Sequence, residues 1–190
     1  MRINRLEIKG FGKLKNRTVK LTKGINILYG RNEAGKTTLQ WYIRAMLYGL
    51  KNTRQTKNGA ISPQKRFEPW FGGRYGGTME YTLDDGSSYR VERDFKNGTV
   101  RLFDSGFKDI TGSFETGRDK MPLFAEKQLG LDEAAFERTV LIRQSEVGLD
   151  DAGAGVLAER LANVRDTGAE DVSFSRAEKL PTLSLVSIIW

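Results

Sequence analysis

Residues 30–37 of this 190-residue chain, GRNEAGKT, fit G-x-x-x-x-G-K-[ST], a pattern found where a buried strand turns through a loop into a helix. Both flanks agree with this setting. Ahead of the loop, the nearly continuous apolar run INILY at 25–29 predicts a strand buried on both faces of a sheet. Behind it, residues 36–49 place apolar residues on one helical face and end at Gly49, a typical helix stop. The segment therefore predicts an α/β fold organised around a phosphate-binding loop.

The residue types in the loop suit it to nucleotide phosphates. Glycine permits the backbone angles that turn N–H groups toward an anion, and the following helix N-terminus adds its dipole. Lys36 would place its charge at the β- and γ-phosphates, the Thr37 hydroxyl would ligate Mg²⁺, and Thr38 would support the α-phosphate. The other predicted binding positions of the loop are Gly30, Asn32, Glu33, Ala34 and Gly35.

The sequence lacks the other parts of a hydrolytic site. A P-loop usually works with an Asp at the end of an apolar strand, the Walker B carboxylate, and no run of four apolar residues is followed by an acid here. The nearest match, YTLDD at 81–85, falls in a predicted hairpin, and no N-K-x-D sequence of a GTPase occurs. With neither Cys nor His, the chain also excludes disulfides, thiolate or imidazole metal sites, a cysteine nucleophile and a Ser-His triad.

The rest of the chain predicts short strands followed by helices. Alternating apolar and charged residues predict strands at 2–9 and 18–22, and a polar, basic stretch at 51–66 predicts a loop. Turn sequences predict antiparallel hairpins over 75–111. Helical patterns follow at 119–139, where Gly130 would end one segment and Asp132 would cap the next, and at 155–165. We therefore divide the chain into a lobe at 1–150 with a β insertion at 75–111, a helical segment at 151–180, and an apolar tail at 181–190.

Charge is unevenly distributed along the chain. Residues 1–66 hold 16 Lys and Arg against two acids, a net charge of +14, whereas residues 67–190 hold 15 against 22, a net charge of −7. The basic part fits either a surface for a polyanion or an ordinary solvated surface. The N-terminus shows no signal-peptide pattern and no apolar run is long enough to span a membrane, so we expect a soluble, cytoplasmic protein with no membrane partner.

Three stretches resemble a known family: IKGFGKLKN at 8–16, GINILYGRNEAGKTTL at 24–39 and FERTVLIRQSEV at 136–147. They are similar to the N-terminal ATPase lobe of the SMC-like, SbcC/RecF-type DNA-repair ATPases, with Asn-Glu-Ala between the motif glycines as in the YhaN-type branch. The resemblance covers about residues 1–145. It implies a P-loop NTPase fold of the ABC-ATPase head type, with a mixed sheet and an inserted antiparallel β-hairpin subdomain.

The resemblance also implies roles for residues and partners. Gln144 would be the Q-loop glutamine, which contacts Mg²⁺ and the attacking water, so Lys36 and Gln144 would be the catalytic residues of this lobe. Lys13 matches the region that packs against adenine and ribose. The family's cofactors are ATP and Mg²⁺. Its partners are a C-terminal lobe with Walker B and the signature motif, a second head, double-stranded DNA and a nuclease subunit. Glu33 departs from the family, because many relatives have Gly there.

Three hypotheses follow. The first is the ATP-binding half of an ATPase head, which hydrolyses little without a C-terminal lobe. The second is a non-catalytic DNA-binding or regulatory module that retains the P-loop as a fold element. The third, a small nucleotide kinase, lacks recognisable lid arginines. Aromatic residues leave a related question open: Trp41 and Tyr42 fit core packing, whereas Trp70 and Phe71 fit either a packed loop or an exposed surface for a partner.

Overall fold

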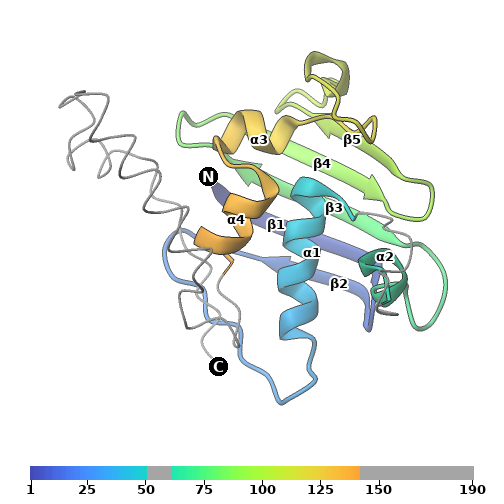
Figure 1. Cartoon of the computed structure of the whole chain (residues 1–190). Helices are drawn as coiled ribbons and strands as arrows, with labels where there is room; N and C mark the ends of the chain where they lie inside the picture. Colours follow the sequence, from blue (N-terminus) through green and yellow to red (C-terminus); the bar gives the residue numbers. More distant parts are fainter. Residues whose placement is uncertain (51–60, 142–190) are drawn as a thin grey trace, which may run out of the picture.

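The computed structural model describes residues 1–50 and 61–141. In this part of the chain a five-stranded sheet carries helices on one face (Figure 1). The elements, in chain order, are β1 (Arg2–Phe11), β2 (Leu14–Lys20), α1 (Lys36–Tyr48), α2 (Pro63–Arg66), β3 (Gly76–Thr82), β4 (Ser88–Asp94), β5 (Thr99–Phe103), the 3₁₀ turn η1 (Thr111–Ser113), α3 (Phe124–Leu129) and α4 (Glu133–Thr139).

The strand order is β2-β1-β3-β4-β5, and every neighbouring pair is antiparallel. The predicted hairpins over 75–111 are present, because Gly86 and Gly98 supply the positive φ values of 87° and 65° that their turns require. β3 pairs with β1, so these hairpins continue the sheet that the first two strands begin. Parallel strands of the expected mixed sheet do not occur among the described residues.

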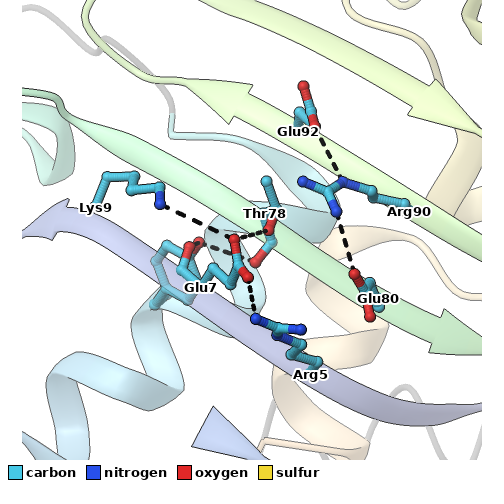
Figure 2. Close-up of polar contacts among 8 residues, drawn as sticks. Arg5, Glu7, Lys9, Thr78, Glu80, Arg90 and Glu92 are labelled. Atoms are coloured by element: carbon cyan, nitrogen blue, oxygen red, sulfur yellow. Dashed lines mark hydrogen bonds and ion pairs between the residues drawn. The ribbon is translucent and has the colours of Figure 1, made fainter. Parts of the chain in front are cut away.

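The two faces of the sheet differ in chemistry. Helices α1, α3 and α4 lie over one face (Figure 1), and the side chains between the layers are almost fully buried. The largest of these core residues are Leu6, Ile8, Phe11, Tyr42, Met46, Leu47, Met79, Tyr81, Val91, Leu102 and Phe124. The opposite face carries charged side chains that form ion pairs (Figure 2): Arg90 of β4 pairs with Glu80 of β3 at 3.2 Å and with Glu92 of its own strand at 3.0 Å.

A close approach fixes the helix of the predicted phosphate loop on the sheet. The Tyr42 hydroxyl of α1 donates to the Glu7 carbonyl of β1 at 2.9 Å, and the Thr78 carbonyl of β3 lies 3.3 Å away. A Cβ atom on Gly77 would lie 2.5 Å from that hydroxyl oxygen and 2.0 Å from the Glu7 carbonyl oxygen. Glycine at 77 therefore lets the middle of α1 reach the strands directly.

The helix predictions are confirmed in outline. α1 spans Lys36–Tyr48 and ends at Gly49, within the predicted 36–49. The pattern at 119–139 yields α3 and α4: Gly130 ends the first with a φ of 65°, and the Asp132 carboxylate accepts the Ala135 N–H at 2.7 Å to cap the second.

Three elements differ from prediction. β2 begins four residues before the predicted 18–22, because its pairing with β1 starts directly after the turn at Gly12. Part of the predicted loop at 51–66 forms α2, since Ser62 caps it and a proline occupies its first turn. The predicted strand at 25–29 is absent, as described below.

The predicted segments at 151–180 and 181–190 lie outside the described residues. None of the described helices is long and apolar enough to cross a membrane.

Candidate nucleotide-binding site

The segment that enters the phosphate loop has no regular secondary structure and is largely exposed. The prediction of a strand at 25–29 buried on both faces is wrong here: Ile25, Ile27 and Tyr29 are 74%, 67% and 94% exposed. An apolar segment becomes a buried strand only when neighbouring strands pair with it and other elements cover it. In the described part of the chain, none of the five strands does so. A local hydrogen bond holds the start of this segment instead: the Asn26 carboxamide oxygen accepts the Thr22 N–H at 2.9 Å.

The loop itself follows a tight path that demands unusual backbone angles. The Ala34 N–H donates to the Arg31 carbonyl at 3.0 Å and closes a turn. Within it Glu33 adopts a φ of 64°, a left-handed conformation that favours glycine. This is the position at which Glu33 departs from the family pattern. Gly35 follows with a φ of 99°, and a Cβ atom there would lie 2.9 Å from the Leu14 Cδ2 atom.

Lys36 spans the loop. Its Nζ atom donates to the carbonyl of Gly30 at 2.6 Å and to that of Arg31 at 3.0 Å. The lysine thus joins the end of the motif to its beginning, and its ammonium group lies against the loop backbone. The ammonium group has three N–H donors, so it can turn from these carbonyls toward another acceptor. An anion bound at the loop would therefore contact Lys36 directly.

The N-terminus of α1 is arranged for an anion. The helix begins at Lys36, directly after the loop, and its cap residue Gly35 makes no side-chain capping bond in the described structure. Its first turn contains no acidic residue that would neutralise the positive end of the helix dipole. Thr37 is exposed and Thr38 is half-buried, so the Thr37 hydroxyl is open to solvent at the mouth of the loop. Asn32 and Ala34 are exposed as well.

Lys13 lies beside the loop. Its Cγ and Cδ atoms come within 3.6 Å of the place that a Cβ atom on Gly35 would take. Its Nζ atom lies 5.8 Å from the centroid of the Trp70 ring. The structure therefore brings together Lys13 and residues 30–38, which the sequence analysis singled out from two separate motifs.

The predicted catalytic residue Gln144 lies outside the described residues. In the hairpin sequence at 81–85, Asp84 pairs with the N-terminal ammonium group at 2.9 Å and Asp85 accepts the Ser87 N–H at 2.8 Å. Asp84 therefore holds the N-terminus of the chain, whereas Asp85 stabilises the turn. Across residues 1–50 and 61–141, no group of three or more acids could hold a metal ion.

Two buried arginines hold the far end of α1, and sequence reasoning missed both. The Arg93 guanidinium donates to the carbonyls of Met46 at 2.7 Å and Leu47 at 2.9 Å, and burial lowers its pKa to about 10. Arg44 donates to the Gly49 carbonyl at 3.0 Å and pairs with Glu133 and Glu137 of α4. The one available signal was alternation in β4, which places Arg93 on the same side as Val91.

Comparison with known proteins identifies the family. A family model described as an AAA domain matches residues 5–179. The chain belongs to this AAA family. Uncharacterized protein YhaN of Bacillus subtilis is 36% identical over 94 residues, which are 49% of this chain and 9% of YhaN. The DNA double-strand break repair Rad50 ATPase of Thermoplasma volcanium is 26% identical over 149 residues, which are 77% of this chain and 16% of that protein.

Solved structures include proteins of similar architecture, two of which are RecF and an SMC head. The recombination mediator protein RecF with ATP matches with a TM-score of 0.41 and 17% identity, over 60% of this chain and 31% of RecF. The SMC head domain of Thermotoga maritima matches with a TM-score of 0.37 and 13% identity, over 58% of this chain and 39% of the head.

The AAA family match confirms the predicted family and its fold class. The chain is similar to the N-terminal lobe of an SMC-like, RecF-type ATPase. It spans 9% and 16% of the length of the two curated relatives.

Proposed function

We propose that this lobe binds ATP with Mg²⁺ at residues 30–38. The observation that carries the proposal is the junction at Gly35: a loop with two left-handed residues leads into an uncapped helix N-terminus with no acid in its first turn. N–H groups of such a junction and the helix dipole together favour a phosphate group. Lys36 then exchanges its loop carbonyl partners for the β- and γ-phosphates, which carry more negative charge.

The proposed magnesium site is shared between this lobe and other groups. Mg²⁺ prefers oxygen ligands in octahedral geometry and is usually held by one or two protein groups plus phosphates and water. The exposed Thr37 hydroxyl is suited to be one such ligand, and Gln144 is proposed as another from the family resemblance. A bound Mg²⁺ ion would neutralise charge on the phosphates. No group of three or more potential metal ligands occurs among the described residues, and we propose that the Walker B carboxylate comes from another lobe.

A C-terminal lobe is the proposed source of that carboxylate, and the exposed segment at 25–29 supports it. The run INILY at 25–29 is mostly apolar, yet Ile25, Ile27 and Tyr29 stay exposed among the described residues. A strand from another lobe would cover it and would bring a carboxylate next to the P-loop. We further propose that two such heads engage around ATP and that the assembly acts on DNA together with a nuclease partner. By itself this lobe should bind ATP and hydrolyse it only weakly.

The test of nucleotide binding is the substitution Lys36→Ala. We expect ATP affinity to fall on the order of 100-fold, because two charge-assisted contacts to phosphate are lost. Titration calorimetry with ATP, with and without Mg²⁺, measures this. Lys20→Ala, an exposed lysine on the edge strand β2, is the matched control and should bind ATP normally. Unchanged ATP affinity in Lys36→Ala would favour the alternative, a DNA-binding or regulatory module whose P-loop is a fold element.

The test of the second lobe is the substitution Ile27→Lys. Since Ile27 is 67% exposed, the free energy of unfolding of this chain should change by less than about 0.5 kcal/mol. Association with the C-terminal segment of YhaN, expressed separately, should be lost, together with the ATP hydrolysis that the added segment restores. Phe107→Lys is the control, because Phe107 is 74% exposed and follows β5 at the opposite sheet edge. Equal association of both variants would contradict a docking role for residues 25–29.

A further inference from the structure

Two adjacent aromatic side chains are exposed in the loop between α2 and β3. Trp70 and Phe71 are 69% and 67% exposed, although both are large and apolar. Their neighbour Phe67 is buried, stacked on Phe11 with ring centroids 4.9 Å apart. Trp41 and Tyr42 of α1 belong to the core or lie against it. The structure thus separates the aromatics that pack the interior from a pair that faces solvent.

The exposed pair sits on a fixed backbone. The Trp70 N–H donates to the Gly12 carbonyl at 3.0 Å, and the Gly12 N–H donates to the Phe67 carbonyl at 2.7 Å. The loop also lies close to β1, since a Cβ atom on Gly10 would come within 2.2 Å of the Arg74 carbonyl oxygen. Both rings are therefore presented from a loop tied to the β1–β2 turn, which lowers the ordering cost of binding a ligand.

Each ring has a lysine beside it. The Lys13 Nζ atom lies 5.8 Å from the centroid of Trp70, and the Lys15 Nζ atom lies 5.8 Å from that of Phe71. The surrounding sequence is basic: residues 9–24 hold six Lys and Arg and no acid, and residues 61–75 hold three against Glu68. The surface formed by Lys13, Lys15, Trp70 and Phe71, hereafter the aromatic–lysine platform, thus combines flat apolar faces with positive charge.

We propose that the aromatic–lysine platform binds single-stranded nucleic acid. Aromatic side chains stack with nucleobases of any sequence, while lysines neutralise the backbone phosphates between them. A duplex hides the faces of its bases, so exposed rings favour an unpaired strand. An apolar protein partner fits less well, because it would have to desolvate the two ammonium groups beside the rings. The platform does not require nucleotide at the P-loop, so this inference stands apart from the proposed ATP binding.

The experiment compares oligothymidylate of 16 nucleotides with a duplex of equal length by fluorescence anisotropy. The double substitution Trp70→Ala and Phe71→Ala should weaken binding of the single strand by about tenfold or more, because it removes the rings on which bases stack. Duplex binding should stay unchanged. Trp70→Phe should retain most of the affinity. Phe107→Ala removes an equally exposed aromatic from a turn beyond β5 and should have no effect. Lys36→Ala should also bind the single strand normally.

Salt dependence provides a second measurement that does not depend on the aromatic variants. Replacing Lys13 and Lys15 by Gln should reduce the slope of log affinity against log salt by about 1.4, since two phosphate contacts on a single strand contribute roughly 0.7 each. Circular dichroism checks that every variant is folded.

Three results would overturn the proposal. The first is equal single-strand affinity of wild type and the double alanine variant. The second is an equal loss in Phe107→Ala. The third is that the double variant loses affinity for ATP but not for inorganic tripolyphosphate, with no change for the oligonucleotide. That outcome would assign the platform to the base of the P-loop nucleotide. A failure of ATP binding in the wild type would count against the proposed function alone.

Discussion

The two ends of α1 are held in opposite ways. At its C-terminal end, the buried Arg93 guanidinium satisfies the carbonyls of Met46 and Leu47, and Arg44 joins the helix to α4. At its N-terminal end, Gly35 provides no side-chain cap and the preceding loop is largely exposed. The contrast shows how one helix can be held firmly at one end and present its N-terminus to a ligand at the other.

The difference between the ends can be tested by substitution. Changes at the C-terminal end should lower stability, whereas changes at the N-terminal end should alter the nucleotide site while stability changes little.

The largest effect on stability is expected for Arg93→Leu. The variant leaves the carbonyls of Met46 and Leu47 without their donor in a buried environment, which should lower the free energy of unfolding by about 2–4 kcal/mol. Urea denaturation measures the change. Arg90→Leu lies on the same strand but on the opposite face, where Arg90 pairs with Glu80 and Glu92 at the surface (Figure 2), so it should cost less than about 1 kcal/mol. Similar losses of stability in both variants would show that the contacts of Arg93 with the end of α1 have no special role.

A smaller effect is expected for Tyr42→Phe in the middle of α1. Loss of the hydroxyl removes its bond to the Glu7 carbonyl and should lower the free energy of unfolding by about 1 kcal/mol. Glu7 still pairs with Thr18 and Thr78 in the sheet, so the fold should remain intact by circular dichroism. Tyr29→Phe is the matched control: Tyr29 is 94% exposed, and its hydroxyl should contribute nothing measurable to stability. A stability change in the control, or none in Tyr42→Phe, would contradict the docking role of Tyr42.

The smallest effect is expected for Glu33→Gly at the N-terminal end. Glycine adopts the φ of 64° without strain, but it gains more freedom in the unfolded chain, so the net gain in stability should be about 0.5 kcal/mol. Thermal denaturation in the absence of nucleotide measures it. ATP affinity should stay within about twofold, since the loop offers N–H groups rather than this side chain. Clear destabilisation by glycine would mean that the Glu33 carboxylate makes a contact that stabilises the loop.

Local signals predicted the elements that carry their own boundary chemistry. The start of α1 after Gly35, the stop at Gly130 and the cap at Asp132 follow from residues that satisfy or free nearby backbone groups. The hairpin turns were predictable for the same reason. Partners distant in sequence were not: Arg93 contacts carbonyls 46 and 47 residues away, and Arg44 reaches Glu137 across 93 residues.

The sequence by itself determined the phosphate loop, the helix behind it and the family, because these depend on short-range spacing of glycine, lysine and threonine. Only the tertiary structure decided three further points. It left residues 25–29 exposed, it placed Lys13 against Gly35, and it turned Trp70 and Phe71 toward solvent while Phe67 entered the core. Burial depends on which elements pack over a residue. An apolar sequence pattern indicates that burial is favourable, but it does not specify which element covers the residue.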